Sequence, residues 1–330
     1  MRRRLSVALR AATLVHLLVL LVATALVVFA GDLYWPVAIL MLLPLPALAV
    51  PAALLVPVLA LVRLWRWVMA EAIALAVTAI FLLGANVAVP DPGPPTFRIL
   101  AWNVHFGDAG VDAFARELRA VAPDVALFEA TNHDAHNALL AAFPGFHVER
   151  LASYSIASRF PITDRGVPWE LATRSGPPYA RFTVDTPSGP VKIFAVHPVS
   201  QRGAFYQTFR HGGLRRAFKV AHDLFADDYD RRRNELSSLA REAAAAGPRV
   251  LVAGDFNVAG RSRLLASLFG DFQDSFVERG TGFGYTFPVR HPFLRLDRIL
   301  GKGFRFVRTG VGGQQASDHR PVYADVALAP

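Results

Sequence analysis

The first ninety residues are almost wholly apolar, and this feature constrains the fold more than any other. Their only charged residues are six arginines, Asp32 and Glu71. A helix needs roughly 20 residues to cross the ~30 Å hydrocarbon core of a bilayer. Three apolar stretches reach that length: 7–29, 37–62 and 68–89. The sequence therefore predicts a membrane anchor over residues 1–90 with three transmembrane helices. A cleaved signal peptide is disfavoured because the first run is too long and others follow it.

The arginines predict how the anchor is oriented, since short loops rich in Lys and Arg stay in the cytoplasm. The N-terminal arginines up to Arg10 place that end inside, and Arg63 and Arg66 mark a return to the same side. Pro36 precedes the middle stretch and four prolines interrupt it, and a re-entrant loop there would leave the rest of the chain in the cytoplasm. Both charged ends favour a full crossing. We therefore expect a multi-pass protein of the cell inner (cytoplasmic) membrane, with its soluble domain on the extracytoplasmic side.

Residues 91–96 form a Pro/Gly linker, and residues 97–330 have the pattern of a soluble domain. Short apolar or alternating runs predict strands at 97–104, 124–129, 154–158, 180–185, 191–197, 249–253, 296–300 and 322–326. Helices are expected at 112–121 and within a long charged stretch, 201–246. Strands alternating with helices over this length favour an α/β fold, namely a two-layer β-sandwich flanked by helices. The all-α transmembrane region would precede it.

The net charge and the cysteine content exclude few classes of binding partner. The soluble domain has 29 Lys and Arg against 23 Asp and Glu, so its net charge is about +6. That excess suits an anionic substrate, and it equally suits adhesion to an anionic lipid surface. The chain contains no cysteine and hence no disulfide, so cysteine usage does not indicate a redox compartment.

Polar side chains stand at the ends of the expected strands, where a buried strand has no structural need for them. They are Asn103, Glu129, His197, Asp255, Asn257, Asp297, Asp318 and His319. Carboxylate and amide oxygens are hard ligands that suit Mg²⁺, with Mn²⁺ or Ca²⁺ as alternatives. Histidines can donate hydrogen bonds to a phosphoryl group, and a carboxylate beside the cation can orient water. This composition fits metal-assisted hydrolysis of a phosphoester.

From Phe97 to Val326 the sequence resembles the endonuclease/exonuclease/phosphatase superfamily, the deoxyribonuclease-like metal-dependent phosphoesterases. The matching motifs, in chain order, are Trp102-Asn103-Val104, Glu129, Ile156 to Ile162, Val196-His197, Gly254-Asp255-Phe256-Asn257, Leu296-Asp297-Arg298-Ile299, and Ser317-Asp318-His319-Arg320-Pro321-Val322. Each motif is weak alone, but their order and their positions beside strands make the set specific. The resemblance implies a deoxyribonuclease-like four-layer α/β/β/α fold.

The resemblance also implies a role for each motif residue. Glu129 would be the principal metal ligand, assisted by Asn103 and Asp318. Asp255 would position or activate the water, and Asn257 would bind a phosphate oxygen. His319, paired with Asp297, would stabilise the transition state, and His197 would contact the phosphate from the other side. Phe128 and Ser155 depart from the residues that many members carry, Gln and Gly, without removing a catalytic group.

Structural explanations compete with some of these assignments. Asn103 alone could be a turn residue, Glu129 a helix cap, and Asp297 an exposed ion pair between two arginines. The 201–246 stretch interleaves aromatic and basic residues, which could form a lid at the membrane surface. The alternative is that its aromatic residues pack on the sandwich while Arg231 to Arg233 stay in solvent.

Three functions follow from these patterns. The first is a phosphatase that cleaves a phosphate ester or diphosphate, with a lipid-linked substrate at the outer leaflet as the example. The second is an extracytoplasmic nuclease acting on DNA or RNA, which the basic charge would serve. The third is a binding module that has lost catalysis, although no catalytic group is missing. The expected partners are the lipid bilayer and a phosphorylated substrate, with no protein partner.

Overall fold

The computed structural model describes residues 2–89, 91, 93–107, 111–173, 176–200, 214–313 and 316–329. The chain divides into two compact units. One comprises Met1–Asn86 with Ala259–Leu264, and the other comprises Val87–Val258 with Leu265–Pro330. The first is called the N-terminal unit here, and the second is called the sandwich unit.

The N-terminal unit is helical. Its α-helices are α1 (Arg2–Ala25), α2 (Trp35–Leu40), α3 (Val50–Leu61) and α4 (Trp65–Val77). Two stretches, Arg3–Leu33 and Trp65–Leu82, are long and apolar enough to cross a membrane, and Leu45–Leu61 is a shorter apolar helix. The middle stretch is thus not one helix over 37–62. The chain turns between α2 and a 3₁₀ segment, Leu45–Ala49, because prolines at 44 and 46 cannot continue the hydrogen-bonded ladder.

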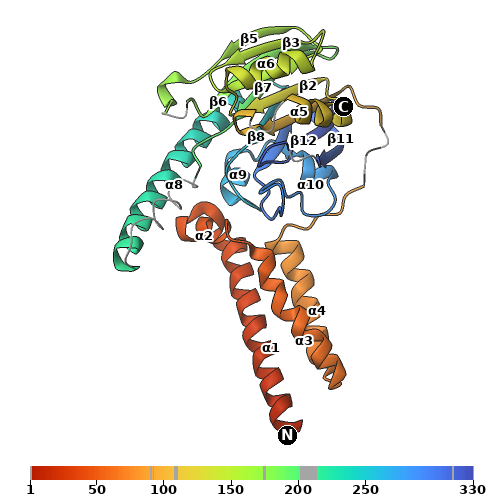
Figure 1. Ribbon diagram of the computed structural model, residues 1–330, viewed down its shortest axis with the longest axis vertical. Coiled ribbons are helices and arrows are strands. Elements are labelled where there is room, and N and C mark those ends of the chain that lie inside the picture. Colours follow the sequence, from red (N-terminus) through yellow and green to blue (C-terminus); the bar gives the residue numbers. More distant parts are fainter. Residues whose placement is uncertain are drawn as a thin grey trace. The chain divides into compact units, whose positions relative to one another are not determined.

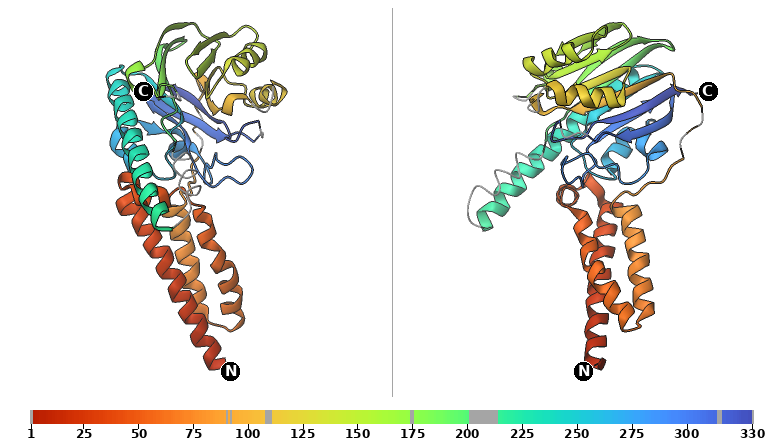
Figure 2. Two further views of the ribbon diagram at one scale, coloured as in Figure 1. Left: turned by 60° about the vertical axis from the view of Figure 1, so that its left-hand side comes forward. Right: turned by 45° about the vertical axis from the view of Figure 1, so that its right-hand side comes forward.

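Helices α1, α3 and α4 pack side by side (Figure 2). The start of α1 and the turn between α3 and α4 lie at the same end of this bundle. Inside it, His16 of α1 contacts Glu71 of α4 at 2.9 Å through Nδ1, and its Nε2 lies 2.8 Å from the carbonyl of Leu48. In either tautomer, one of these two oxygens can accept the ring N–H of His16. This buried contact ties three segments of the unit together.

The sandwich unit contains two mixed sheets of six strands each, counted over the residues described above. The first has the order β11-β12-β1-β2-β4-β3, and the second β5-β6-β7-β8-β10-β9. The strands of the first sheet are β1 (Phe97–Asn103), β2 (Val125–Glu129), β3 (His147–Leu151), β4 (Tyr154–Ser158), β11 (Phe304–Val311) and β12 (Val322–Leu328). Those of the second are β5 (Ile162–Gly166), β6 (Tyr179–Thr186), β7 (Gly189–Val196), β8 (Val250–Asp255), β9 (Gln273–Asp274) and β10 (Asp297–Lys302).

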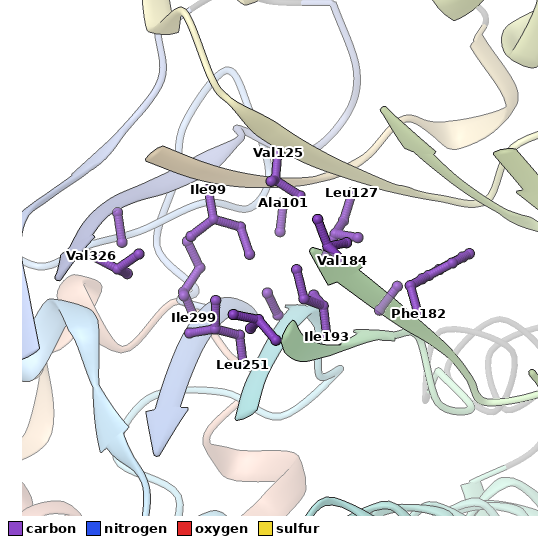
Figure 3. Close-up of a cluster of buried hydrophobic side chains, with 14 of the residues drawn as sticks. Ile99, Ala101, Val125, Leu127, Phe182, Val184, Ile193, Leu251, Ile299 and Val326 are labelled. Carbon is purple, nitrogen blue, oxygen red and sulfur yellow. The ribbon is translucent and has the colours of Figure 1, made fainter. Parts of the chain in front are cut away.

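The two sheets pack face to face through alternate residues of their strands, as the period of two requires. Figure 3 shows this core: Ile99, Ala101, Val125 and Leu127 from the first sheet face Ile193, Leu251 and Ile299 from the second. The intervening residues of β1 and β2, such as Trp102 and Phe128, point to the outer face and pack under helices. All of these core and outer-face side chains are almost completely buried.

Helices cover the outer faces and complete four layers, α/β/β/α (Figure 1). Helices α5 (Val111–Val121) and α6 (His133–Ala142) lie on the first sheet, where Phe114 and Leu139 join its outer cluster. Helix α8 (Leu214–Ala245) lies on the second sheet, and its Glu242 accepts hydrogen bonds from Tyr179 and Arg181 of β6. The short helices α9 (Arg263–Leu268) and α10 (Ser275–Arg279) follow β8. The predicted fold class is confirmed.

Candidate active site

The candidate site lies at one end of the layer between the sheets, where the inward-facing positions change from apolar to polar. In β1 and β2 the inward series runs from Ala101 to Asn103 and from Leu127 to Glu129. Asn103 and Glu129 are direct neighbours in the parallel pairing of these strands. Because residues two apart in a strand point to the same face, Asn103 and Glu129 lie at the ends of their strands with their side chains on the core side. The alternation therefore positions both side chains without a special loop.

The second sheet contributes its polar groups in the same way. Asp255 ends β8 and Asp297 begins β10, and the two are paired across this antiparallel contact. His197 follows β7, whose last residue is paired with Gly254 of β8. Gly254 is required there, because a β-carbon would lie 2.4 Å from the carbonyl of Val196 and 2.7 Å from Oε1 of Glu129. The backbone of β8 thus passes close to a carboxylate of the opposite sheet.

Asp255 is the centre of the hydrogen-bond network. Its Oδ2 accepts from the amide of Asn103 at 3.0 Å and lies 3.6 Å from Nε2 of His319 and 3.9 Å from Nε2 of His197. Its Oδ1 accepts from the backbone N–H of Asn257 at 2.8 Å. Burial acts to raise the pKa of Asp255, but the two histidines and these donors outweigh it and lower the pKa below its ordinary value. Asp255 is therefore ionised at neutral pH.

His319 and Asp297 form a buried pair, with Nδ1 of the ring 2.9 Å from the carboxylate. Burial opposes charge on the ring, yet Asp297 and Asp255 together raise the pKa of His319 to about 9. Burial raises the pKa of Asp297 in turn, although His319 opposes the shift. Thr286 holds Asp297 from behind, since its hydroxyl accepts the backbone N–H of Asp297 at 3.3 Å. His319 is thus a protonated donor whose Nε2 faces Asp255.

Glu129 is the clearest indication of a ligand. Its side chain is 0% exposed, and neither carboxylate oxygen has a hydrogen-bond partner. Burial, followed by the charges of Asp297 and Asp255, raises the pKa of Glu129 well above its ordinary value. Oδ1 of Asp297 is also buried without a partner. An unpaired buried carboxylate is costly, and a bound cation removes that cost.

The residues present therefore fit a divalent cation of the hard, oxygen-binding kind. The carboxylates of Glu129, Asp255 and Asp297 are buried at one end of the core. Both oxygens of Glu129 and Oδ1 of Asp297 have no hydrogen-bond partner and are free to bind a cation. Asp255, Asp297 and His319 alone place ligand atoms within 4.8 Å of one another. In that trio, however, the ring N–H of His319 is already bonded to Asp297. The unpartnered oxygens of Glu129 and Asp297 are the freer ligands.

The structure brings all eight residues predicted from the sequence into or beside one cluster, with Asp318 at its margin. Asn257 adopts a left-handed backbone conformation, φ +52°, and its amide donates to the carbonyl of Pro198 at 2.9 Å. Asp318, the eighth, is half-buried and contacts the hydroxyl of Ser317 at 3.4 Å. The same hydroxyl donates to the carbonyl of Asn103 at 2.7 Å. Asp318 thus adjoins the network through Ser317.

Two of the competing structural explanations are wrong. Asp297 is buried and paired with His319, so it is not an exposed ion pair; the flanking Arg295 and Arg298 bind Asp274 instead. Glu129 caps no helix, because the N-cap of α6 is Asn132, whose side chain accepts from the N–H of Ala135.

The expectation that Arg231 to Arg233 stay in solvent is wrong for Arg232, which is 3% exposed. The proposed surface lid falls largely on residues 201–213 and on side chains of 214–222, which lie outside the described residues.

Sequence reasoning missed Tyr154, Arg232 and Glu235. Tyr154 begins β4 on the core side near Glu129, and its hydroxyl donates to the carbonyl of Pro177 at 2.9 Å. Its inward position follows from the same alternation that identifies Glu129, because Ile156 lies two residues on in the same core. Arg232 and Glu235 occupy the buried stripe of α8, marked by Phe225, Tyr229, Leu236 and Leu239. Two charged residues within the apolar stripe of this helix were the sequence signal that could have identified them.

Comparisons with known proteins agree with this architecture. The mannosyl-6-phosphatase of Bacteroides thetaiotaomicron VPI-5482 is 15% identical, with a TM-score of 0.54 over 70% of this chain and 100% of its own. D. rerio TDP2 in complex with a single-strand DNA product is 15% identical, with a TM-score of 0.54 over 70% of this chain and 99% of its own.

A structure from Beutenbergia cavernae DSM 12333, described as an endonuclease/exonuclease/phosphatase, is 19% identical, with a TM-score of 0.50 over 71% of this chain and 72% of its own. At these identities the likeness shows the fold. A search of curated proteins found no match.

The sandwich and its polar end place the chain among proteins with a deoxyribonuclease-like fold. The family model for the Endonuclease/Exonuclease/phosphatase family matches residues 100–319, and the chain belongs to this family. The resemblance predicted from the motifs is confirmed. Members are phosphoesterases or nucleases and are generally dependent on a divalent metal.

Proposed function

We propose that the protein is a membrane-anchored, divalent-cation-dependent phosphoesterase. It would hydrolyse a phosphate ester or diphosphate outside the cytoplasmic membrane, with a lipid-linked substrate as the preferred class. The observation that carries the catalytic part is Glu129, a fully buried carboxylate with no partner for either oxygen, beside Asp255, Asp297 and His319. A cation held there by Glu129, with help from Asn103 and Asp318, would supply charge neutralisation for a bound phosphoryl oxygen.

The chain's own residues would carry the remaining chemistry. Asp255, ionised and held by Asn103, would orient a water molecule and accept its proton as the water oxygen bonds to phosphorus. The bond from phosphorus to the leaving oxygen breaks in the same displacement. His319, protonated and fixed by Asp297, would donate from Nε2 to a phosphoryl oxygen where negative charge increases. His197, with its side chain 28% exposed, would donate from the open side. The side-chain amide of Asn257, held by the carbonyl of Pro198, would add a further contact to the phosphoryl group.

The anchor favours a substrate within the membrane surface. The apolar stretches Arg3–Leu33 and Trp65–Leu82 leave large side chains exposed, among them Leu14, Leu18 and Ile73, which are 56%, 59% and 59% exposed. Apolar residues exposed in such number on a helix indicate contact with lipid. Tethering would keep the site within reach of lipid headgroups and restrict its access to polymers. Together these points support the lipid-linked class.

The test is phosphate release by the full-length protein in detergent micelles. Polyprenyl diphosphate with Mg²⁺ should yield phosphate, and chelation with EDTA should abolish the release. Glu129→Gln and His319→Gln should each reduce kcat by roughly 10²- to 10⁴-fold. Wild-type rates in both variants, or phosphate release that survives EDTA, would refute metal-assisted catalysis at this site.

A nuclease is the alternative function. Its support is the net charge of the soluble domain, about +6, and the fold shared with a protein that binds a single-strand DNA product. Plasmid nicking with Mg²⁺ at low salt, falling steeply as salt rises, would favour it over the lipid phosphatase. Both reactions would use the same residues, so the substrate panel separates them.

A further inference from the structure

Helix α8 carries two buried charged residues that bond to the backbone beside the candidate site. Arg232 is 3% exposed and Glu235 is 4% exposed, whereas Arg231 and Arg233 on the same turns are exposed. Residues three apart on a helix lie on one face. Arg232 and Glu235 therefore point together toward the sandwich.

Both residues bind Val199, two positions after His197. Glu235 accepts the N–H of Val199 at 2.8 Å, and Arg232 donates to the carbonyl of Val199 at 3.3 Å. Helix α8 thus binds both the backbone N–H and the carbonyl of Val199. The segment that places His197 cannot shift along the sheet without breaking these bonds.

Arg232 also holds the turn after β8. The same Nη1 donates to the carbonyl of Asn257 at 3.3 Å. Asn257 in turn donates its amide to the carbonyl of Pro198 at 2.9 Å. One guanidinium thus links the segment after β7 to the turn after β8, and these two segments carry His197 and Asn257.

Stability alone does not explain why charges occupy these positions. Apolar residues of similar volume often replace buried ions with no loss of stability or with a gain. The neighbouring buried positions on this face of α8 are apolar, for example Leu236 and Leu239. A planar guanidinium with several donors can join two carbonyls from different loops, which an apolar side chain cannot do.

From this geometry we infer that Arg232 and Glu235 are positioning residues. They fix His197 and Asn257 on the open side of the site through the backbone of Val199 and Asn257. The inference rests on the proposed function for its effect on catalysis, since the two held residues would contact the phosphoryl group. A displacement of about 1 Å in such residues can reduce a rate by about 10²-fold.

The experiment uses the full-length protein in detergent, with Arg232→Met as the test and Arg233→Met as the matched exposed control. Assayed well below its melting temperature, which the loss of the guanidinium beside buried Glu235 should lower, Arg232→Met should reduce kcat for phosphate release by about 10- to 100-fold with little change in KM. Arg233→Met should behave as wild type. Glu235→Gln, which keeps an acceptor for Val199, should retain more activity than Glu235→Leu.

Chemical rescue separates positioning from a merely structural role. Added guanidinium ion should restore activity to Arg232→Ala, where the side-chain space is free, and should leave Arg232→Met unchanged. Wild-type kcat in Arg232→Met would overturn the inference. A loss of activity that only follows a lower melting temperature, without rescue, would overturn it as well.

Hydrogen exchange measures the same contacts without any substrate. Arg232→Met should increase amide exchange in residues 196–200 and 255–259, and Arg233→Met should not. Unchanged exchange in both segments refutes the inference even if the wild-type protein hydrolyses nothing. Absence of metal-dependent hydrolysis with raised exchange would instead reject only the proposed function.

Discussion

At the scale of single residues, the site depends on how three buried carboxylates share one end of the core. Asp255 has histidine and amide partners that lower its pKa, and Asp297 has His319. Glu129 has neither, and its pKa is raised by burial and by the other two acids. The three side chains are chemically alike, and their surroundings give them different roles. Glu129 is the one whose ionised form requires a cation.

This difference predicts an unusual effect of Glu129→Met on stability. Without metal, the raised pKa means that the folded state keeps a proton which the unfolded state releases, so stability falls as pH rises above the ordinary glutamate range. At neutral pH the metal-free variant should therefore be more stable than wild type by roughly 1–3 kcal/mol. Thermal unfolding with and without Mg²⁺ measures this.

Mg²⁺ should raise the melting temperature of wild type and leave Glu129→Met unchanged, because a ligand that binds only the folded state stabilises it. Glu278→Gln, on the exposed face of α10, serves as the control and should respond to Mg²⁺ as wild type does. Equal stabilisation of Glu129→Met by Mg²⁺ would show that the cation binds elsewhere.

His319 predicts the alkaline side of the pH profile. Its pKa of about 9 lies above the ordinary histidine value, so the charged ring and its contribution to stability are fully present below about pH 6.5. Both are lost as pH rises through about 9. The kcat of wild type should fall there, and the residual kcat of His319→Gln should lack this decline. A pH titration of both rates checks it, and an alkaline decline that persists in the variant would assign it to another group.

At the scale of elements, much of the sandwich could be predicted because strand alternation is a local property. The runs ending at Asn103, Glu129 and Asp255 alternate between inner and outer positions, and the structure places those residues on the inner side. The edge strands of both sheets were harder to predict. β3, β5, β9 and β11 were not expected, since β3 and β5 are partly exposed, β9 has only two residues, and β11 contains a register shift. Exposed strands lack the apolar pattern that identifies them.

The contacts made by α8 could not be read from the sequence for a different reason. Arg232 is chemically identical to its neighbours at 231 and 233, and only its position in the apolar stripe of α8 distinguishes it from them. Its partners Val199 and Asn257 are 33 and 25 residues away along the chain. Long-range backbone acceptors leave no motif. The apolar stripe of α8 could indicate that Arg232 and Glu235 are buried, but their backbone partners become known only from the packed structure.

At the scale of the whole molecule, the chain joins an apolar helical N-terminal unit to the sandwich unit. The linker between them, residues 91–96, is bonded to the sandwich unit. Asp91 forms an ion pair with Arg305 at 2.5 Å, and the N–H of Thr96 donates to the carbonyl of Val326 at 2.7 Å. The linker is therefore bonded to the sandwich unit from its first residue, Asp91.

If residues 1–90 anchor the protein in a membrane, as proposed, the number of times they cross it decides which side the candidate site faces. The start of α1 and the turn before α4 lie at one end of the bundle, as three crossings would require. The chain has no cysteine, so single substitutions report on one position at a time. In intact bacterial cells, a membrane-impermeant maleimide should label Glu278→Cys in the sandwich unit. It should label Trp65→Cys, at the start of α4, only after permeabilisation. If the broken middle stretch fails to cross, the two labelling patterns exchange, and the extracytoplasmic assignment is wrong.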